Sequence, residues 1–260
     1  MEQGFHKRRR QNPTVTELPE TMIFGRNAVI ELLKSGRSVD KIWIREGERE
    51  GSLKFIGAQA AARGIPVISV SRTKLDEMTC NLPHQGVVAM AAERDYCSLD
   101  DILDYAAQRG EKPLIVIADG IEDPQNLGAL IRTAECAGAH GVIIPKRRSV
   151  GLTGAVAKAS AGAIEHVRIA RVTNLAAAVD ELKEKGVWIY AAEADGTPYT
   201  QTDLSGAVAI VLGSEGFGVS RLVREKSDFI LSIPMYGQVN SLNVSAAASV
   251  LVFEAARQHH

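Results

Sequence analysis

The chain has 260 residues and a net charge of −1, and its 45% hydrophobic and 23% charged content is typical of a globular protein with one or two domains. It has no run of eighteen apolar residues, and no apolar segment follows the basic N-terminal stretch, so neither a membrane span nor a secretion signal is predicted. The three cysteines are scattered and odd in number, which favours a reducing, cytoplasmic location. Neither the cysteines nor the six histidines have metal-ligand spacing, so no metal site is expected.

Residues 1–20 are polar and basic and contain two prolines, which predicts a flexible tail. The segment 21–94 alternates between helix and strand signals and is predicted to be a small α/β domain. Its expected helices are 27–34, 53–62 and a short helix capped by Ser71 or Thr73, and its expected strands are 41–44, 67–70 and 86–92. The amphipathic stretch 95–111 is predicted to be a linker helix on which this first domain is free to move.

Residues 112–260 are predicted to form a second α/β domain. Its expected strands are 114–118, 141–144, 167–172, 187–192, 209–213 and 229–234, and its main expected helices are 124–137, 174–185, 219–226 and 242–257. The strands are almost continuously apolar and alternate with helices, which predicts a mostly parallel sheet covered on both faces. Ligands of such sheets bind at the carboxyl ends of the strands, so the loops there are the candidate sites.

The loop after the first of these strands reads "ADGIEDPQNLG" and leads into a helix that Asp123 can cap, with Pro124 at its first position. On that helix Arg132 lies opposite the apolar stripe formed by Leu127, Leu130, Ile131 and Ala134. Arg132 is therefore either a functional side chain or an ordinary surface arginine.

Two further loops are rich in glycine or in small polar residues. "VLGSEGFGVS" places three glycines around Glu215, which lets the backbone approach a ligand closely, although a tight structural turn is the alternative. The loop lacks the glycine spacing of a dinucleotide fingerprint and the Lys-Ser/Thr of a phosphate-binding loop. "IPMYGQVNSLNVSAAAS" offers Asn and Ser donors and acceptors before a helix, where simple capping is the alternative.

Basic residues gather locally despite the neutral total. The segment 146–171 contains six Lys and Arg residues and one acidic residue, Glu165, for a local charge of +5. Such clusters favour phosphate contact, with a solvated surface as the alternative. The first domain adds Arg26, Lys34, Arg37, Lys41 and Arg45 near the ends of its elements, which predicts a role in affinity for nucleic acid, and for RNA if the resemblance given below holds.

Three segments, "DPQNLGALIRTAECAG", "VLGSEGFGVS" with the following "SIPM", and "SLNVSAAASVLVFEA", resemble in order the motifs of the SpoU/TrmH family of RNA ribose 2′-O-methyltransferases, in the SPOUT superfamily. The resemblance covers residues 112–257. "FGRNAVIELL" and "HQGVVAM" resemble the family's N-terminal substrate-binding domain, a ribosomal-protein-like RNA-binding fold. "KASAGAIEHV" and "RVTNLAAAV" are similar to the branch that methylates a guanosine of 23S rRNA.

The resemblance implies a catalytic domain with a deep trefoil knot whose loops bind S-adenosylmethionine. The matching cofactor-binding positions are Gly213, Ile233 and Leu242, and the matching catalytic and site-shaping positions are Asn126, Arg132, Glu215, Ser241 and Asn243. Transfer of a methyl group to a hydroxyl needs no metal. A guanidinium stays protonated, so we expect Arg132 to grip the adjacent phosphate rather than to act as a base.

Other functions stay open at this stage. Within the family, tRNA is the alternative substrate. A non-catalytic RNA-binding or ribosome-assembly protein and a nucleotide-dependent oxidoreductase are alternatives of other classes, the last disfavoured by the missing fingerprint glycines. We also expect a homodimer formed through the catalytic domain, because the small-residue helix 242–257 is too apolar for one sheet to cover fully.

Overall fold

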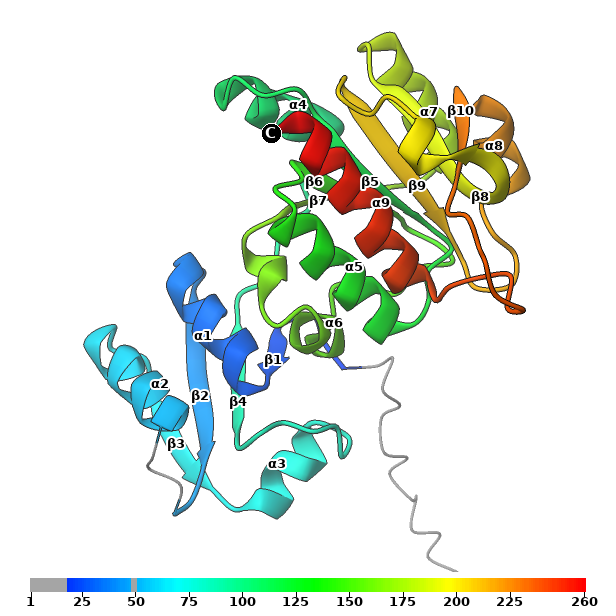
Figure 1. Cartoon of the computed structure of the whole chain (residues 1–260). Coiled ribbons are helices and arrows are strands. Elements are labelled where there is room, and N and C mark those ends of the chain that lie inside the picture. Colours follow the sequence, from blue (N-terminus) through cyan, green and yellow to red (C-terminus); the bar gives the residue numbers. More distant parts are fainter. Residues whose placement is uncertain (1–17, 48–50) are drawn as a thin grey trace, which may run out of the picture.

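The computed structural model describes residues 18–47 and 51–260, which form two α/β domains (Figure 1). The predicted basic tail lies outside the described residues except for its last three positions. The first domain contains β1 (Met22–Phe24), α1 (Arg26–Ser35), β2 (Val39–Arg45), α2 (Gly51–Ala62), β3 (Val67–Val70), α3 (Arg72–Met78) and β4 (Val87–Ala91). Ser71 caps α3, as one of the two sequence alternatives predicted.

The first domain is built on a four-stranded sheet of order β1-β4-β2-β3. β4 pairs antiparallel with β1 and β2, whereas β2 pairs parallel with β3. The sequence predicted three of these strands and missed β1, because three residues are too few to show a strand periodicity. Leu32 of α1, Ile42 of β2 and Ile56 of α2 are buried together and hold the two helices on the sheet.

The second domain has a six-stranded, wholly parallel sheet of order β10-β8-β9-β5-β6-β7, which confirms the predicted fold class. Its strands are β5 (Leu114–Asp119), β6 (Gly141–Pro145), β7 (Arg168–Val172), β8 (Trp188–Pro198), β9 (Val208–Gly213) and β10 (Phe229–Ser232). Its helices are α5 (Pro124–Cys136), α6 (Gly154–Ala159), α7 (Leu175–Glu184), α8 (Arg221–Lys226) and α9 (Val244–His259). The short α6 was not predicted.

Alternate residues of the central strand β5 face opposite layers of helices. Val116 and Ala118 are buried with side chains of α5 and α9, which lie side by side on one face (Figure 1). Ile115 and Ile117 are buried with side chains of α4 (Leu99–Gln108), α7 and α8 on the other face. Burial on both faces explains why the strands read as continuous apolar runs.

Helix α4, which the sequence predicted to be a linker helix, packs on the sheet of the second domain. Its Leu99 and Ile102 are buried in the apolar cluster on the face of the sheet that α7 and α8 also cover. A Cβ on Gly141 of β6 would have no room beside Ile102. The two domains also contact each other where β1 and α1 meet α6 and the 163–165 turn (Figure 1). In the structure the first domain thus packs against the second, and its motion on the linker stays a prediction.

Candidate active site

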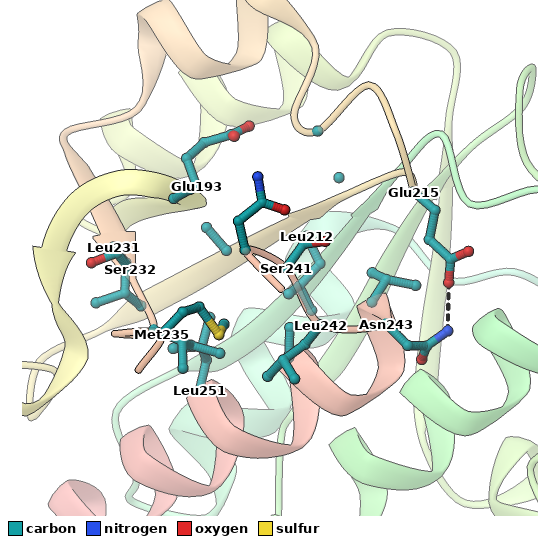
Figure 2. Close-up of a pocket in the computed structure, with 18 of the residues that line it drawn as sticks. Glu193, Leu212, Glu215, Leu231, Ser232, Met235, Ser241, Leu242, Asn243 and Leu251 are labelled. Carbon is teal, nitrogen blue, oxygen red and sulfur yellow. Dashed lines mark hydrogen bonds between the residues drawn. The ribbon is translucent and has the colours of Figure 1, made fainter. Parts of the chain in front are cut away.

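A cavity of about 990 Å³ opens at the carboxyl ends of β9 and β10, beside the start of α9 (Figure 2). The three predicted cofactor-binding residues, Gly213, Ile233 and Leu242, line it together with Glu215, Ser241 and Asn243. The volume lies at the upper end of the range for small-molecule sites. Six of the eight predicted site residues are therefore brought to one cavity from two loops that are distant in sequence.

Gly213 is required by the close packing of the 213–219 loop. A Cβ at this position would overlap the backbone of Gly218 and Val219. Ser214 and Gly218 close the loop by exchanging backbone hydrogen bonds of 3.2 and 3.0 Å. Gly216 and Gly218 have φ angles of +88° and +66°, which favour glycine. The glycines thus make a compact, preformed loop at the end of β9.

Two carboxylates hold this loop from behind, and the sequence analysis did not single out either one. Asp119, at the end of β5, accepts a hydrogen bond of 2.7 Å from the Ser220 backbone N–H. Glu193, in β8, accepts one of 2.7 Å from the Val219 backbone N–H. Asp119 belongs to the segment "ADGIEDPQNLG", which the sequence indicated as a candidate site loop. No motif in β8 pointed to Glu193.

Three predicted residues form a hydrogen-bonded cluster at the edge of the cavity. Asn126 Nδ2 donates to Glu215 Oε1 at 3.0 Å, and Asn243 Nδ2 donates to Asn126 Oδ1 at 2.9 Å. Asn243 Nδ2 also donates to the same Glu215 oxygen (Figure 2). Asn243 Oδ1 accepts from the Ser245 backbone N–H at 2.9 Å and caps α9. Glu215 Oε1 accepts the hydrogen bonds from both Asn126 and Asn243, so Glu215 Oε2 is left as a free acceptor within the described structure.

The structure does not bring Arg132 to this cluster. Arg132 is exposed on α5, as the helical stripe predicted, and it does not line the cavity. It lies beside Cys136 at the C-terminal end of the helix, six residues beyond Asn126. Burial raises the pKa of Cys136, and Glu135 adds to this effect while Arg132 opposes it. Arg132 therefore lies outside both cavities of its own chain.

The basic segment 146–171 divides into structural and exposed members. The guanidinium of Arg168 lies 3.4 Å from the centre of the Tyr105 ring, and Arg171 is 3.8 Å from Glu20. Burial lowers the pKa of Lys158. Lys146, Arg147 and Arg148 are exposed, so only this part of the cluster is open to phosphate.

The cations of the first domain divide in the same way. Arg37 donates to Glu165 and to the Ala92 carbonyl, and Lys34 pairs with Glu31 at 2.8 Å. Lys41 lies 5.3 Å from the centre of the Trp43 ring. The expectation that Arg37 contributes to RNA affinity is therefore corrected, since its side chain joins the two domains.

Comparison with known protein families decides which family has this architecture. Residues 113–253 match the SpoU rRNA methylase family, and residues 22–97 match the domain described as RNA 2′-O ribose methyltransferase substrate binding. The chain belongs to the SpoU/TrmH family of RNA methyltransferases. This confirms the family that the three sequence motifs indicated; the 23S rRNA branch and the knot stay predictions.

Relatives and solved structures agree with this assignment. A protein of Bacillus subtilis named as a TrmH-family tRNA/rRNA methyltransferase, YacO, is 47% identical over 92% of this chain and 96% of its own length. A Staphylococcus haemolyticus protein named likewise is 48% identical over 94% and 98%. The AdoMet-bound rRNA methyltransferase of Sinorhizobium meliloti is 26% identical, with a TM-score of 0.72 over 91% of this chain and 87% of that one. AviRb of Streptomyces viridochromogenes, 23% identical with a TM-score of 0.76 over 91% and 89%, shows the shared fold.

S-adenosylmethionine is the cofactor of this SpoU/TrmH methyltransferase, and the large cavity fits it. Apolar side chains of Leu212, Leu231 and Leu251 line the cavity and offer a surface for an adenosine. Within the described structure, the backbone of residues 233–242 makes no hydrogen bond to other backbone groups. Its N–H and C=O groups are therefore available to the polar edge of an adenine.

Two kinds of feature are absent from residues 18–47 and 51–260. No group of three or more His, Cys, Asp or Glu side chains is arranged to hold a metal ion. No helix in these ranges has the length and apolar character needed to cross a membrane.

Proposed function

We propose that this SpoU/TrmH protein methylates a ribose 2′-hydroxyl in structured RNA, and that its target is a guanosine of 23S rRNA. The observation that carries the proposal is the Asn126–Glu215–Asn243 cluster, which presents a free carboxylate oxygen at the edge of the cofactor cavity. The substrate-binding domain supports RNA as the partner. A 2′-hydroxyl is the group that distinguishes RNA from DNA.

Ribosomal RNA is favoured over tRNA by the extent of the structural matches. The rRNA methyltransferase of Sinorhizobium meliloti aligns with 91% of this chain, so both domains have counterparts. The tRNA-modifying TrmH/SpoU enzyme of A. aeolicus aligns with 60% of it, and a structure described by 2′-OH methylation of C/U34 on tRNA aligns with 56%. This difference in coverage supports a ribosomal substrate for a chain that has the N-terminal domain, and tRNA is the second candidate.

The residues of the chain supply orientation and proton handling. S-adenosylmethionine provides an electrophilic methyl group on its sulfonium. A ribose hydroxyl is a weak nucleophile that needs a hydrogen-bond acceptor as it attacks, and Glu215 Oε2 is placed to accept that hydrogen. The amides of Asn126 and Asn243 fix the carboxylate, so little reorganisation is needed when the substrate arrives.

The position of Arg132 supports a homodimer as part of the proposal. The chain exposes Tyr236, Val239, Leu242 and Phe253 on α9 and the segment before it, which is an apolar surface suited to a second copy. α9 packs against α5, the helix that carries Arg132. A symmetric pair formed on this side can bring Arg132 of one chain to the cluster of the other, where it grips the RNA phosphate.

The test is to map ribose methylation in 23S rRNA and tRNA from cells with and without the protein. We expect one 2′-O-methylguanosine of 23S rRNA to disappear with the protein and to be restored by purified enzyme with S-adenosylmethionine. The Glu215→Gln variant should bind the cofactor but restore little methylation. An unchanged rRNA pattern together with a lost tRNA methyl group would replace the first candidate by the second. Unchanged patterns in both RNAs would overturn the proposed function.

A further inference from the structure

A second cavity, of about 720 Å³, adjoins the cofactor cavity and shares part of its wall, including Glu215 and Gly218. It lies between the loop that follows β5 and the loop that follows β9, and Arg148 borders it. Because Glu215 lines both cavities, a nucleotide bound in the second one can place its ribose beside this carboxylate. Its size is sufficient for a purine nucleotide.

Phe217 stands at the rim of this second cavity with its side chain 94% exposed. The residues around it are firmly held: Ser214 and Gly218 are paired through their backbones, and Val219 is bonded to Glu193. A large apolar ring on a rigid loop is presented to solvent without a partner in the described chain. Such an aromatic surface stacks on a nucleobase at little cost in conformational entropy.

Glu122 offers a free carboxylate in the same cavity. The three other acidic residues that line it are each engaged: Asp119 with Ser220, Asp123 with the start of α5, and Glu215 with the two amides. Glu122 makes no hydrogen bond or ion pair among residues 18–47 and 51–260 and is exposed. Among the described acidic residues that line the cavity, Glu122 therefore has both carboxylate oxygens available to a ligand, beside the single free oxygen of Glu215.

Arg148 completes the set of unpaired groups. It has a φ angle of +56°, a conformation that favours glycine, and it makes no ion pair within the described residues. Strained non-glycine residues of this kind cluster at ligand sites. Its guanidinium supplies a positive charge at the border of a cavity that is otherwise rich in carboxylates.

We propose that the second cavity binds the unstacked base of the target nucleotide and selects guanine. The ring of Phe217 stacks on the base, Glu122 accepts hydrogen bonds from N1–H and the N2 amino group, and Arg148 contacts a flanking phosphate. Guanine is the standard base with two adjacent donors on this edge, whereas adenine and cytosine place an acceptor there and uracil has a single donor between two carbonyls. The assignment rests on the proposed function, since it needs RNA as the substrate, and it explains how a target base is recognised outside the duplex.

The test compares short RNAs that contain the mapped target nucleotide as guanosine or as inosine, which lacks the N2 amino group. We expect the wild-type enzyme to methylate the guanosine RNA with a kcat/KM about 10-fold above that of the inosine RNA, because inosine lacks one of the two hydrogen bonds to the Glu122 carboxylate. In Glu122→Gln the kcat/KM for guanosine should fall while that for inosine holds, so the ratio should approach one. Glu184→Gln, which removes an exposed carboxylate on α7, is the matched control and should keep the wild-type ratio.

The role of Phe217 is tested with the same RNAs and with S-adenosylmethionine binding. Phe217→Ala should raise KM for RNA about 10-fold or more, and Phe217→Trp should restore most of the loss, because any large ring can stack. Cofactor affinity should hold in both. Phe229→Ala, at a phenylalanine 46% exposed at the start of β10 that lines neither cavity, is the matched control.

The outcomes separate the two proposals. An enzyme that methylates none of the RNAs contradicts the proposed function. An enzyme that methylates guanosine and inosine RNAs equally, or a Glu122→Gln variant that still discriminates between them, contradicts only the guanine pocket. A Phe217→Ala variant that loses cofactor affinity with no change in KM for RNA would also contradict the pocket and assign the ring to the cofactor.

Discussion

Arg37 of the substrate-binding domain donates a hydrogen bond of 2.9 Å to Glu165 of the catalytic domain, whose side chain is only 2% exposed. Arg94, in the segment that connects the domains, donates to the other oxygen of Glu165 at 3.2 Å and to the Val167 carbonyl at 3.0 Å. Burial lowers the pKa of Arg94, although the nearby Glu165 opposes this effect. A buried carboxylate between two arginines thus fixes the RNA-binding domain relative to the active site.

The first prediction concerns this contact. Glu165→Ala should lower the free energy of unfolding by about 3 kcal/mol, because removal of one member of a buried ion pair leaves its partners without compensation. It should also make the connecting segment near Arg94 more sensitive to trypsin. Denaturant unfolding and limited proteolysis measure the two effects.

The control for that experiment is an exposed ion pair in the same domain. Arg224 and Asp195 are 2.6 Å apart, with side chains 43% and 68% exposed, so Asp195→Ala should cost less than about 1 kcal/mol. If Glu165→Ala and Asp195→Ala lowered the free energy of unfolding equally, the contact between the domains would contribute no more than an exposed ion pair.

The second prediction concerns Gly213. Gly213→Ala should weaken S-adenosylmethionine binding by about 10-fold or more, because the new methyl group would displace the 218–219 backbone from the cavity wall. Gly57→Ala, in α2, meets nothing within 4 Å and should stabilise the protein slightly with no change in cofactor affinity. Calorimetric titration with the cofactor measures both, and unchanged affinity in Gly213→Ala would contradict the assignment of the cavity.

The third prediction concerns the pH dependence of stability. His140 Nδ1 accepts from the Leu114 backbone N–H at 3.0 Å, so its Nε2 carries the hydrogen and donates to Glu111 at 3.0 Å. Burial lowers the pKa of His140 below the ordinary value of 6.5, and a proton on Nδ1 would face the Leu114 N–H. As the pH falls, the unfolded chain therefore binds this proton before the folded chain does. The contribution of neutral His140 to the free energy of unfolding is present above pH 6.5 and is lost as the pH falls through the folded pKa.

The measurement is the melting temperature between pH 7.5 and 5. It should fall with pH in the wild-type protein and fall less steeply in His140→Asn, which cannot titrate. Burial also lowers the pKa of His259, so some slope should remain in the variant. Parallel curves for the two proteins would contradict the assignment to His140.

The sequence predicted the site better than it predicted how the domains meet. Gly213, Glu215, Ile233, Ser241, Leu242 and Asn243 were named from short motifs, and all of them line one cavity because strand ends of a parallel sheet share an edge. Glu193 was missed because its role depends on a hydrogen bond between β8 and a loop 26 residues away, which leaves no local pattern. Glu165 was counted as the lone acid in a basic run, but it is the buried partner of Arg37 across 128 residues. Local motifs are visible in sequence, whereas pairings over such separations are not.

Arg132 gives the last prediction, because the role that we propose for it requires two chains. It is exposed on α5, so Arg132→Ala should change the free energy of unfolding by less than about 0.5 kcal/mol and should leave cofactor affinity unchanged. If it clamps the RNA phosphate, methyl transfer should fall at least about 10²-fold, and Arg132→Lys should rescue little, since an ammonium cannot make a planar two-pronged contact. Single-turnover methylation measures this loss.

Mixing Arg132→Ala with Glu215→Gln then tests whether the arginine acts across a dimer. If the arginine of one chain serves the cluster of the other, each mixed dimer contains one site with both groups intact and one with neither. Random exchange of subunits makes half of the dimers mixed, so activity should return to roughly a quarter of the wild-type value. If both groups instead acted within one chain, every site in the mixture would lack one of them and no activity would return. Sedimentation that finds only a monomer of 28.0 kDa would exclude the arrangement altogether.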